Sequence, residues 1–331
     1  MSFSIVFLDR ETLTPDADLR DPAFPHTWRD YAKTAAADVV ARAADADIVV
    51  TNKVPIARED LDRLPRLKMI AVAATGVDRI DLAACRERGI VVSNVPGYAV
   101  HSVPEHTFAF ILALRRNVFT YHQAIRQGRW QEAEQFCFLD YPILDLHGAR
   151  LGIIGAGTIG RRVAAIAEAF GMIPLFAARK GQKAPPPPAH QGESERSSTV
   201  AFTDWDEVLA TSDIITLHCP LRPDTRNLIA MPEFRVMARK PLVINTARGG
   251  VIDEADLVSA LNDGLISGAA LDVSVEEPPA PDSPLMTVVH RSNVLLTPHV
   301  AWASRKAMQA LAQQLIDNIE AFAAGQPVNV A

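Results

Sequence analysis

The sequence predicts an α/β protein made of two doubly wound domains with parallel sheets. Short runs rich in Val, Ile and Leu alternate with stretches of helical spacing, and most of these runs lack the alternation of a half-exposed strand. Strands buried on both faces of a parallel sheet have this pattern. The expected strands are Ile5–Leu8, Ile48–Thr51, Met69–Ala73, Ile90–Ser93, Ile173–Ala177, Ile214–Leu217, Leu242–Asn245, Gly268–Val273 and Val294–Leu296.

A glycine-rich turn near the middle of the chain indicates a dinucleotide site. An apolar run leads into Gly155-Ala-Gly157-Thr-Ile-Gly160, and a helical pattern follows with one apolar face: Ile159, Val163, Ile166 and Phe170. In such a motif Gly155 allows the tight turn, Gly157 lets the backbone approach the pyrophosphate, and Gly160 lets helix and strand pack closely. The N–H groups at the start of the helix would face the phosphates. We therefore expect a Rossmann cofactor domain; the alternative is an ordinary tight turn.

The position of this motif predicts how the domains are connected. About 150 residues precede it, and an amphipathic helix at Ser304–Ala324 is expected to return to the first domain. The NAD(P)-binding Rossmann domain, residues 101–299, would then be inserted into a flavodoxin-like substrate-binding domain, residues 1–100 and 300–331. Two crossings between the domains suit a cleft that closes on a ligand.

Three further segments have distinctive composition. Glu105–Trp130 has apolar residues at helical spacing and predicts one long helix. The aromatic-rich arm Trp130–Tyr141 is either a surface loop over its own core or an arm that packs on a second subunit. Lys180–Thr199, with four consecutive prolines, is expected to be a solvated surface loop.

Composition narrows the possible partners and compartments. Hydrophobic residues make up 48% of the chain, which is ordinary for a globular protein with a full core. The net charge is −6, which argues against nucleic acid and anionic membranes as partners. The three cysteines lack metal-ligand spacing, so we expect no metal and a reducing compartment. The segment Met1–Arg10 reads as a first strand rather than a signal peptide, and no apolar run suits a membrane span. A cytoplasmic protein is expected.

Polar residues end three successive strands after the glycine motif, where ligands bind in open α/β sheets. Arg248 follows the first of these strands, Asp272 and Glu277 follow the second, and His299 follows the third. An arginine binds a carboxylate through two hydrogen bonds, and an acid beside a histidine fixes its tautomer. The histidine could then exchange a proton with a carbonyl while a hydride moves to or from nicotinamide. Each residue taken alone could instead be an ordinary turn residue.

These segments resemble the D-isomer-specific 2-hydroxyacid dehydrogenases over nearly the whole chain. The matching runs are Ala74–Asp78, Asn94–Gly97, Pro104–His106, Leu151–Gly160, His218–Thr225, Asn245–Gly250, Leu271–Pro278 and Pro298-His299. The arm from Gly128 to Pro142 is most similar to the bacterial glycerate dehydrogenase, or hydroxypyruvate reductase, branch.

The resemblance implies roles for individual residues. Arg248, Glu277 and His299 match the catalytic set, and the backbone of Thr75 and Gly76, with Arg248, would bind the substrate carboxylate. The resemblance also implies a homodimer held by the long helix and the arm. The implied cofactor contacts are Gly155, Gly157, Thr158, Ile159, Gly160, Ala178, Arg179, Lys180, Cys219, Pro220, Thr225, Thr246, Ala247 and Asp272, with Asp272 at the nicotinamide carboxamide.

One departure from the family pattern bears on cofactor choice. Relatives that use NAD usually carry an acid at the end of the second strand of the motif, where this chain has Ala178 followed by Arg179 and Lys180. A basic residue at that position suits a 2′-phosphate, so we expect NADP to be preferred, with NAD as the alternative. If Arg179 instead stacks on adenine, the enzyme would not discriminate.

The resemblance implies NAD(P)H-dependent reduction of a small 2-oxoacid, such as hydroxypyruvate or glyoxylate, to the D-2-hydroxyacid. One alternative is a formate dehydrogenase, in which a glutamine replaces the catalytic acid, so that Glu277 argues against it. A second is a nicotinamide-sensing corepressor that works by binding proteins. A methyltransferase is a remote third, because it gives Arg248, Glu277 and His299 no joint role.

Overall fold

The computed structural model describes residues 2–185 and 200–331, and the chain divides into two compact units. Unit 1 comprises Met1–Ala99 and Ala303–Ala331, and unit 2 comprises Val100–Trp302. The expected loop Lys180–Thr199 falls outside the described residues from residue 186 onward. Both sheets are parallel and flanked by helices, which confirms the predicted α/β class.

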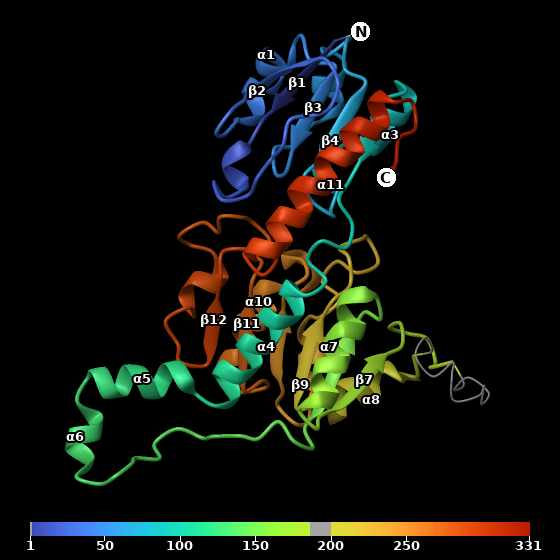
Figure 1. Cartoon of the computed structure of the whole chain (residues 1–331). Coiled ribbons are helices and arrows are strands. Elements are labelled where there is room, and N and C mark those ends of the chain that lie inside the picture. Colours follow the sequence, from blue (N-terminus) through green and yellow to red (C-terminus); the bar gives the residue numbers. More distant parts are fainter. Residues whose placement is uncertain (1, 186–199) are drawn as a thin grey trace. The chain divides into compact units, whose positions relative to one another are not determined.

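Unit 1 is built on a five-stranded sheet with the order β2-β1-β3-β4-β5 (Figure 1). Its central strands are buried along their whole length, as their unbroken apolar runs predict. Ser304 is the N-cap of the last helix, because its hydroxyl accepts a hydrogen bond from the Ala307 N–H. This helix packs on β4. The elements are β1 Phe3–Phe7, β2 His26–Asp30, α1 Val39–Ala43, β3 Ile48–Thr51, α2 Arg58–Leu61, β4 Met69–Val72, α3 Leu82–Glu87, β5 Val91–Ser93 and α11 Arg305–Ala323.

Unit 2 is built on a seven-stranded sheet with the order β12-β11-β10-β9-β6-β7-β8. The strand order reverses between β6 and β9, which is the place where open α/β sheets bind ligands. The glycine turn lies between the first strand of this unit, β6, and the helix α7. The helices α4 and α7 pack side by side (Figure 1). The elements are α4 Ser102–Arg115, α5 Val118–Arg126, α6 Arg129–Ala133, β6 Arg150–Ile154, α7 Thr158–Ala169, β7 Ile173–Ala177, β8 Phe202–Thr203, α8 Trp205–Thr211, β9 Ile214–Leu217, α9 Met231–Val236, β10 Leu242–Asn245, α10 Glu254–Asn262, β11 Gly268–Leu271 and β12 Val294–Leu296.

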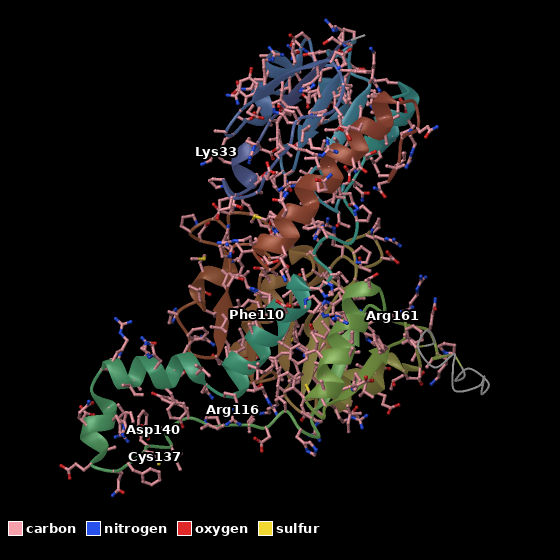
Figure 2. The ribbon with its side chains drawn as sticks, viewed as in Figure 1. Lys33, Phe110, Arg116, Cys137, Asp140 and Arg161 are labelled. Atoms are coloured by element: carbon pink, nitrogen blue, oxygen red, sulfur yellow. The ribbon has the colours of Figure 1, made fainter. Side chains whose placement is uncertain are left out.

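The expected single helix over Glu105–Trp130 is wrong. The chain forms α4, α5 and α6 instead, and it breaks where Asn117 and Gly128 take left-handed backbone conformations with φ of 51° and 89°. Asparagine and glycine tolerate this conformation, so two residues within an apolar helical pattern end the helices. The arm that follows therefore starts within α6, and Figure 2 shows Cys137 and Asp140 at its outer end.

Two strands, β2 and β8, have no counterpart among the expected strands. Both lie at an edge of a sheet, so each pairs with a single neighbouring strand. The sequence of β2 is His-Thr-Trp-Arg-Asp with no fully buried residue, and β8 has only two residues. Edge strands of this kind lack the buried apolar run on which the prediction depended.

Candidate active site

The glycine turn after β6 has the close contacts that only glycine allows. Gly155 has φ of 114°, and a Cβ there would lie 2.7 Å from the carbonyl carbon of His218. A Cβ on Gly160 would lie 2.0 Å from the Gly155 carbonyl oxygen, so the helix α7 starts against the turn itself. At Gly157 a Cβ would meet open space among the described residues, which leaves the backbone accessible to a ligand. These features fit the approach of a pyrophosphate.

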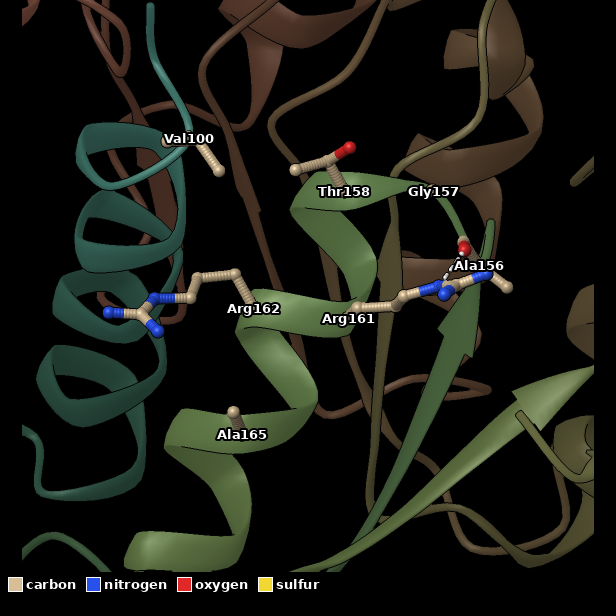
Figure 3. A pocket seen from close by; sticks show the side chains of 7 residues that line it. All are labelled: Val100, Ala156, Gly157, Thr158, Arg161, Arg162 and Ala165. Carbon is tan, nitrogen blue, oxygen red and sulfur yellow. Dashed lines mark hydrogen bonds between the residues drawn. The ribbon is translucent and has the colours of Figure 1, made fainter. Parts of the chain in front are cut away.

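A cleft of about 640 Å³ opens at this turn (Figure 3). Its lining includes Gly157 and Thr158 of the motif, and also Val100, Arg161 and Arg162, which the sequence analysis did not single out. The Arg161 Nε donates a hydrogen bond of 2.9 Å to the Ala156 carbonyl, which holds this guanidinium at the mouth of the cleft. Two arginines within the first two turns of the helix after a glycine motif were the available signal, because they add positive charge near the place where phosphates bind.

The three predicted catalytic residues lie beyond the carboxyl ends of neighbouring strands. Arg248 follows β10, Glu277 lies beyond β11, and His299 follows β12, and these strands are adjacent in the sheet. His299 and Glu277 meet directly, since the His299 Nδ1 lies 2.8 Å from the Glu277 Oε2. Both side chains are partly exposed, at 19% and 25%. With Nδ1 donating to the carboxylate, Nε2 is the ring nitrogen left to exchange a proton with a substrate.

The backbone of the His299 loop is fixed by Asp272, which is 1% exposed. Its Oδ1 accepts a hydrogen bond from the Val300 N–H at 2.9 Å, and its Oδ2 accepts one from the Ala301 N–H at 2.8 Å. The Thr297 hydroxyl also donates to Oδ1, and the His299 N–H donates to the Asp272 carbonyl. His299 has a φ of 55°, a conformation that bulky residues adopt only where the surroundings impose it.

The turn that carries Arg248 is held by Asn245, a fully buried residue at the end of β10. The Asn245 side chain donates to the Arg248 carbonyl at 2.8 Å and accepts from the Ala247 N–H at 3.0 Å. Thr246 lies beside it, with its hydroxyl 3.0 Å from the hydroxyl of Thr107 on α4. Asn245 therefore shapes the predicted substrate-binding turn, although its pattern in the sequence indicates only a strand end.

The loop after β9 packs against the glycine turn. Burial lowers the pKa of His218 to about 3, so the ring is neutral, and its Nε2 shares a hydrogen bond of 2.9 Å with the Thr216 hydroxyl. Burial raises the pKa of the Cys219 thiol to about 11, which keeps it protonated. The Thr225 hydroxyl donates to the Pro220 carbonyl at 2.6 Å and so closes the loop.

The end of β7 carries the residues expected to select the cofactor. Ala178 is buried, and its N–H donates to the Thr203 carbonyl at 2.8 Å. Arg179 is exposed, whereas the Lys180 Nζ lies 2.7 Å from Oε1 of the buried Glu233. Lys180 is thus engaged by an acid that lies far away in the sequence.

The remaining predicted residues, Thr75 and Gly76, belong to unit 1. The Thr75 hydroxyl donates to the Val95 carbonyl at 2.8 Å, and the Asn94 side chain donates to the Thr75 carbonyl at 2.7 Å. These bonds shape the loop that follows β4. Within residues 2–185 and 200–331, no cluster of His, Cys, Asp and Glu suits a metal ion, and no helix is long and apolar enough to cross a membrane.

Comparisons with known proteins identify the family. Residues 108–301 match the model of the NAD-binding domain of the D-isomer-specific 2-hydroxyacid dehydrogenases. The chain is 45% identical to glycerate dehydrogenase from Methylorubrum extorquens, with 100% of this chain and 99% of that protein covered. It is 37% identical to hydroxypyruvate reductase from Blautia hydrogenotrophica, with 98% of each covered.

A solved structure is similar over the same length. The NADPH-dependent glyoxylate/hydroxypyruvate reductase from Sinorhizobium meliloti superimposes with a TM-score of 0.80 at 28% identity, over 99% of this chain and 97% of that chain. The fold, the glycine turn, the histidine–glutamate pair and these relatives lead to one conclusion: the chain belongs to the D-isomer-specific 2-hydroxyacid dehydrogenases, a family of oxidoreductases.

Proposed function

We propose that this enzyme reduces a small 2-oxoacid of the hydroxypyruvate or glyoxylate type to the D-2-hydroxyacid, with NADPH as the preferred cofactor. The observation that carries the proposal is the hydrogen-bonded pair of His299 and Glu277 beyond the sheet that bears the glycine turn. The names of the relatives, which are glycerate dehydrogenase, hydroxypyruvate reductase and glyoxylate reductase, support this substrate class. No specific observation favours a formate dehydrogenase or a corepressor.

In this proposal each residue of the site has a distinct task. The guanidinium of Arg248 binds the 2-oxoacid carboxylate. His299 delivers a proton from Nε2 to the carbonyl oxygen, while Glu277 holds the ring through Nδ1 and stabilises its charged form. The nicotinamide, when bound, supplies the hydride.

The cofactor would lie along the carboxyl edge of the sheet, and the glycine turn would hold its pyrophosphate. The residues proposed for it are Gly155, Gly157, Thr158, Ile159, Gly160, Ala178, Arg179, Lys180, Cys219, Pro220, Thr225, Thr246, Ala247 and Asp272. The cleft at Gly157 and Thr158 supports the first part of this set.

The proposed preference for NADPH depends on the end of β7. Ala178 offers no carboxylate to the ribose hydroxyls, and in the described part of the chain Arg179 has no acidic partner. Lys180 pairs with Glu233, and Lys183 pairs with Asp204 at 2.9 Å, so Arg179 is the cation proposed for the 2′-phosphate. A charge-assisted bond contributes roughly 1.5–3 kcal/mol, which is about a tenfold to hundredfold preference.

Steady-state rates test both proposals. We expect glyoxylate and hydroxypyruvate to be reduced to D-products with a higher kcat/KM for NADPH than for NADH. Arg179→Ala should remove most of that preference, and Ala178→Asp should reverse it, whereas the control Lys183→Ala should leave it unchanged. An enzyme that prefers NADH would show that another group binds the ribose, and absence of turnover with every 2-oxoacid would refute the proposed reaction.

We propose further that the enzyme is a homodimer held by α5, α6 and the arm that ends at Tyr141. This segment exposes large apolar side chains, including Phe136 at 88%, Leu139 at 77%, Phe119 at 61% and Trp130 at 45%. Such a patch is unusual on a monomer and suits an interface with a second copy. Replacing Phe136 and Leu139 with serine should halve the mass measured by light scattering, whereas Val328→Ser in unit 1 should not. A monomeric unmodified protein would refute this assembly.

The proposed compartment is the cytoplasm. The three cysteines are free, as expected for a protein folded under reducing conditions. Fractionation of cells that express the full chain tests this assignment, and recovery outside the cytoplasm would overturn it.

A further inference from the structure

We infer that Glu254 is a positioning residue that fixes the segment carrying Glu277 against the turn carrying Arg248. Glu254 is the first residue of α10, and its Oε1 accepts a hydrogen bond of 2.6 Å from the Val275 N–H. The inference rests on the proposed function, because it concerns how the proposed catalytic groups keep their relative positions.

The peptide between Ser274 and Val275 is the point where these elements meet. A Cβ on Gly249 would lie 2.0 Å from the Ser274 carbonyl carbon and 2.4 Å from the Val275 nitrogen, so the turn after Arg248 packs directly on this peptide. The Ser274 N–H in turn lies 3.3 Å from Oε1 of Glu277. Glu254 therefore holds the peptide that touches the Arg248 turn, and the preceding peptide, between Val273 and Ser274, donates to the Glu277 carboxylate.

The adjoining peptide, between Val273 and Ser274, connects to the proposed proton donor through Glu277. Glu277 uses its Oε1 toward Ser274 and its Oε2 toward the Nδ1 of His299 at 2.8 Å. A displacement of the 274–275 peptide would thus move Glu277 relative to His299. The side chain of Val275 is exposed, so the bond from its N–H to Glu254 of α10 is the contact that links this residue to the helix.

The electrostatics of Glu254 indicate a specific role for its hydrogen bond. Burial and the nearby charges of Asp253 and Glu277 raise the pKa of Glu254, whereas the bond from Val275 opposes this effect. The helix dipole stabilises a carboxylate at any position in the first turn of a helix, including that of Asp256 in α10. The dipole therefore does not explain why a carboxylate lies at residue 254, near the negative charge of Glu277. The hydrogen bond from Val275 does explain it.

Asp256 provides a matched control. It lies in the same first turn of α10 and also accepts one backbone hydrogen bond from another segment, from the Met231 N–H at 2.7 Å. Removing either carboxylate costs one charge and one such bond, but only the bond of Glu254 reaches the Ser274–Val275 peptide.

The test compares Glu254→Ala, Glu254→Gln and Asp256→Ala in the full-length enzyme. Misplacing a catalytic group by about 1 Å costs about a hundredfold, so Glu254→Ala should lower kcat for hydroxypyruvate by about tenfold or more, with the Kd for NADPH unchanged. Glu254→Gln keeps an acceptor oxygen and should recover most of kcat. Asp256→Ala should lower the melting temperature about as much as Glu254→Ala, but keep kcat close to that of the unmodified enzyme.

Hydrogen exchange at the Val275 amide provides a readout that does not depend on turnover. The amide should exchange slowly in the unmodified protein and in Glu254→Gln, and faster in Glu254→Ala. A kcat for Glu254→Ala within threefold of the Asp256→Ala value, or unchanged exchange at Val275, would overturn the inference. Equal loss in Glu254→Gln and Glu254→Ala would also overturn it. An unmodified enzyme without 2-oxoacid turnover would instead refute the proposed function and leave the exchange result to decide the position of the peptide.

Discussion

Gly249→Ala is expected to damage catalysis far more than a neighbouring glycine substitution, because the contact it disrupts is between two backbone segments. The new Cβ would lie 2.0 Å from the Ser274 carbonyl carbon and 2.2 Å from its oxygen. Ordinary contact begins near 3.4 Å, so the Arg248 turn and the Ser274 peptide must separate by about 1.4 Å. Overpacking of this kind costs about 1–3 kcal/mol of stability. A shift of about 1 Å in a positioning group costs about a hundredfold in rate.

Gly250→Ala is the matched control for this prediction. Gly250 is buried in the same turn, but the atoms nearest its Cβ would belong to the side chains of Leu221, at 3.3 Å, and Arg226, at 3.5 Å, and side chains can move. We expect kcat/KM for hydroxypyruvate, measured at saturating cofactor, to fall about a hundredfold in Gly249→Ala and less than about threefold in Gly250→Ala. Both variants should bind NADPH. Similar activity in the two variants would refute the reasoning that the Arg248 turn must rest on the Ser274 peptide.

Two further predictions concern charge. Arg248→Lys keeps the positive charge but loses the planar pair of donors, so KM for the 2-oxoacid should rise and kcat should fall while the Kd for NADPH stays constant; a change in NADPH affinity alone would move Arg248 to the cofactor site. Burial lowers the pKa of His218 to about 3, so the folded protein disfavours the protonated ring. The free energy of unfolding therefore has its full value above the ordinary histidine pKa near 6.5 and decreases as the pH falls toward 3. Between about pH 7.5 and about pH 5 this loss is about 2 kcal/mol. Urea unfolding of the unmodified protein and of His218→Gln should show it as a weaker pH dependence in the variant, and equal pH dependence would contradict it.

The parts of the fold that could be predicted from the sequence are those in which local pattern and burial agree. The strands β3, β9 and β10 are buried along their whole length and have the bounds that their apolar runs predict, and the predicted bounds of β7 and β12 are also confirmed. The edge strand β2 was missed because exposure removes its pattern. The break at Asn117 was missed because a left-handed residue leaves no mark in apolar spacing.

The site shows the same division between local and long-range information. Strand ends indicated Arg248, Glu277 and His299 as neighbours, since carboxyl ends of parallel strands share one edge of a sheet. The residues that hold these side chains in place could not be predicted, because their contacts join segments that are distant in the sequence. Glu254 accepts a hydrogen bond from Val275, and Lys180 forms an ion pair with Glu233. Residue spacing in the sequence indicates neither contact.

The proposed mechanism has His299, held by Glu277, deliver the proton in reduction of a 2-oxoacid. Single-turnover reduction of hydroxypyruvate by enzyme loaded with NADPH tests this role when the unmodified protein is compared with His299→Ala. General acid catalysis contributes about 10²- to 10⁴-fold, so the rate should fall by that factor while NADPH binds with unchanged affinity and the product remains the D-isomer. A His299→Ala enzyme that reduces hydroxypyruvate at close to the unmodified rate would show that another group delivers the proton.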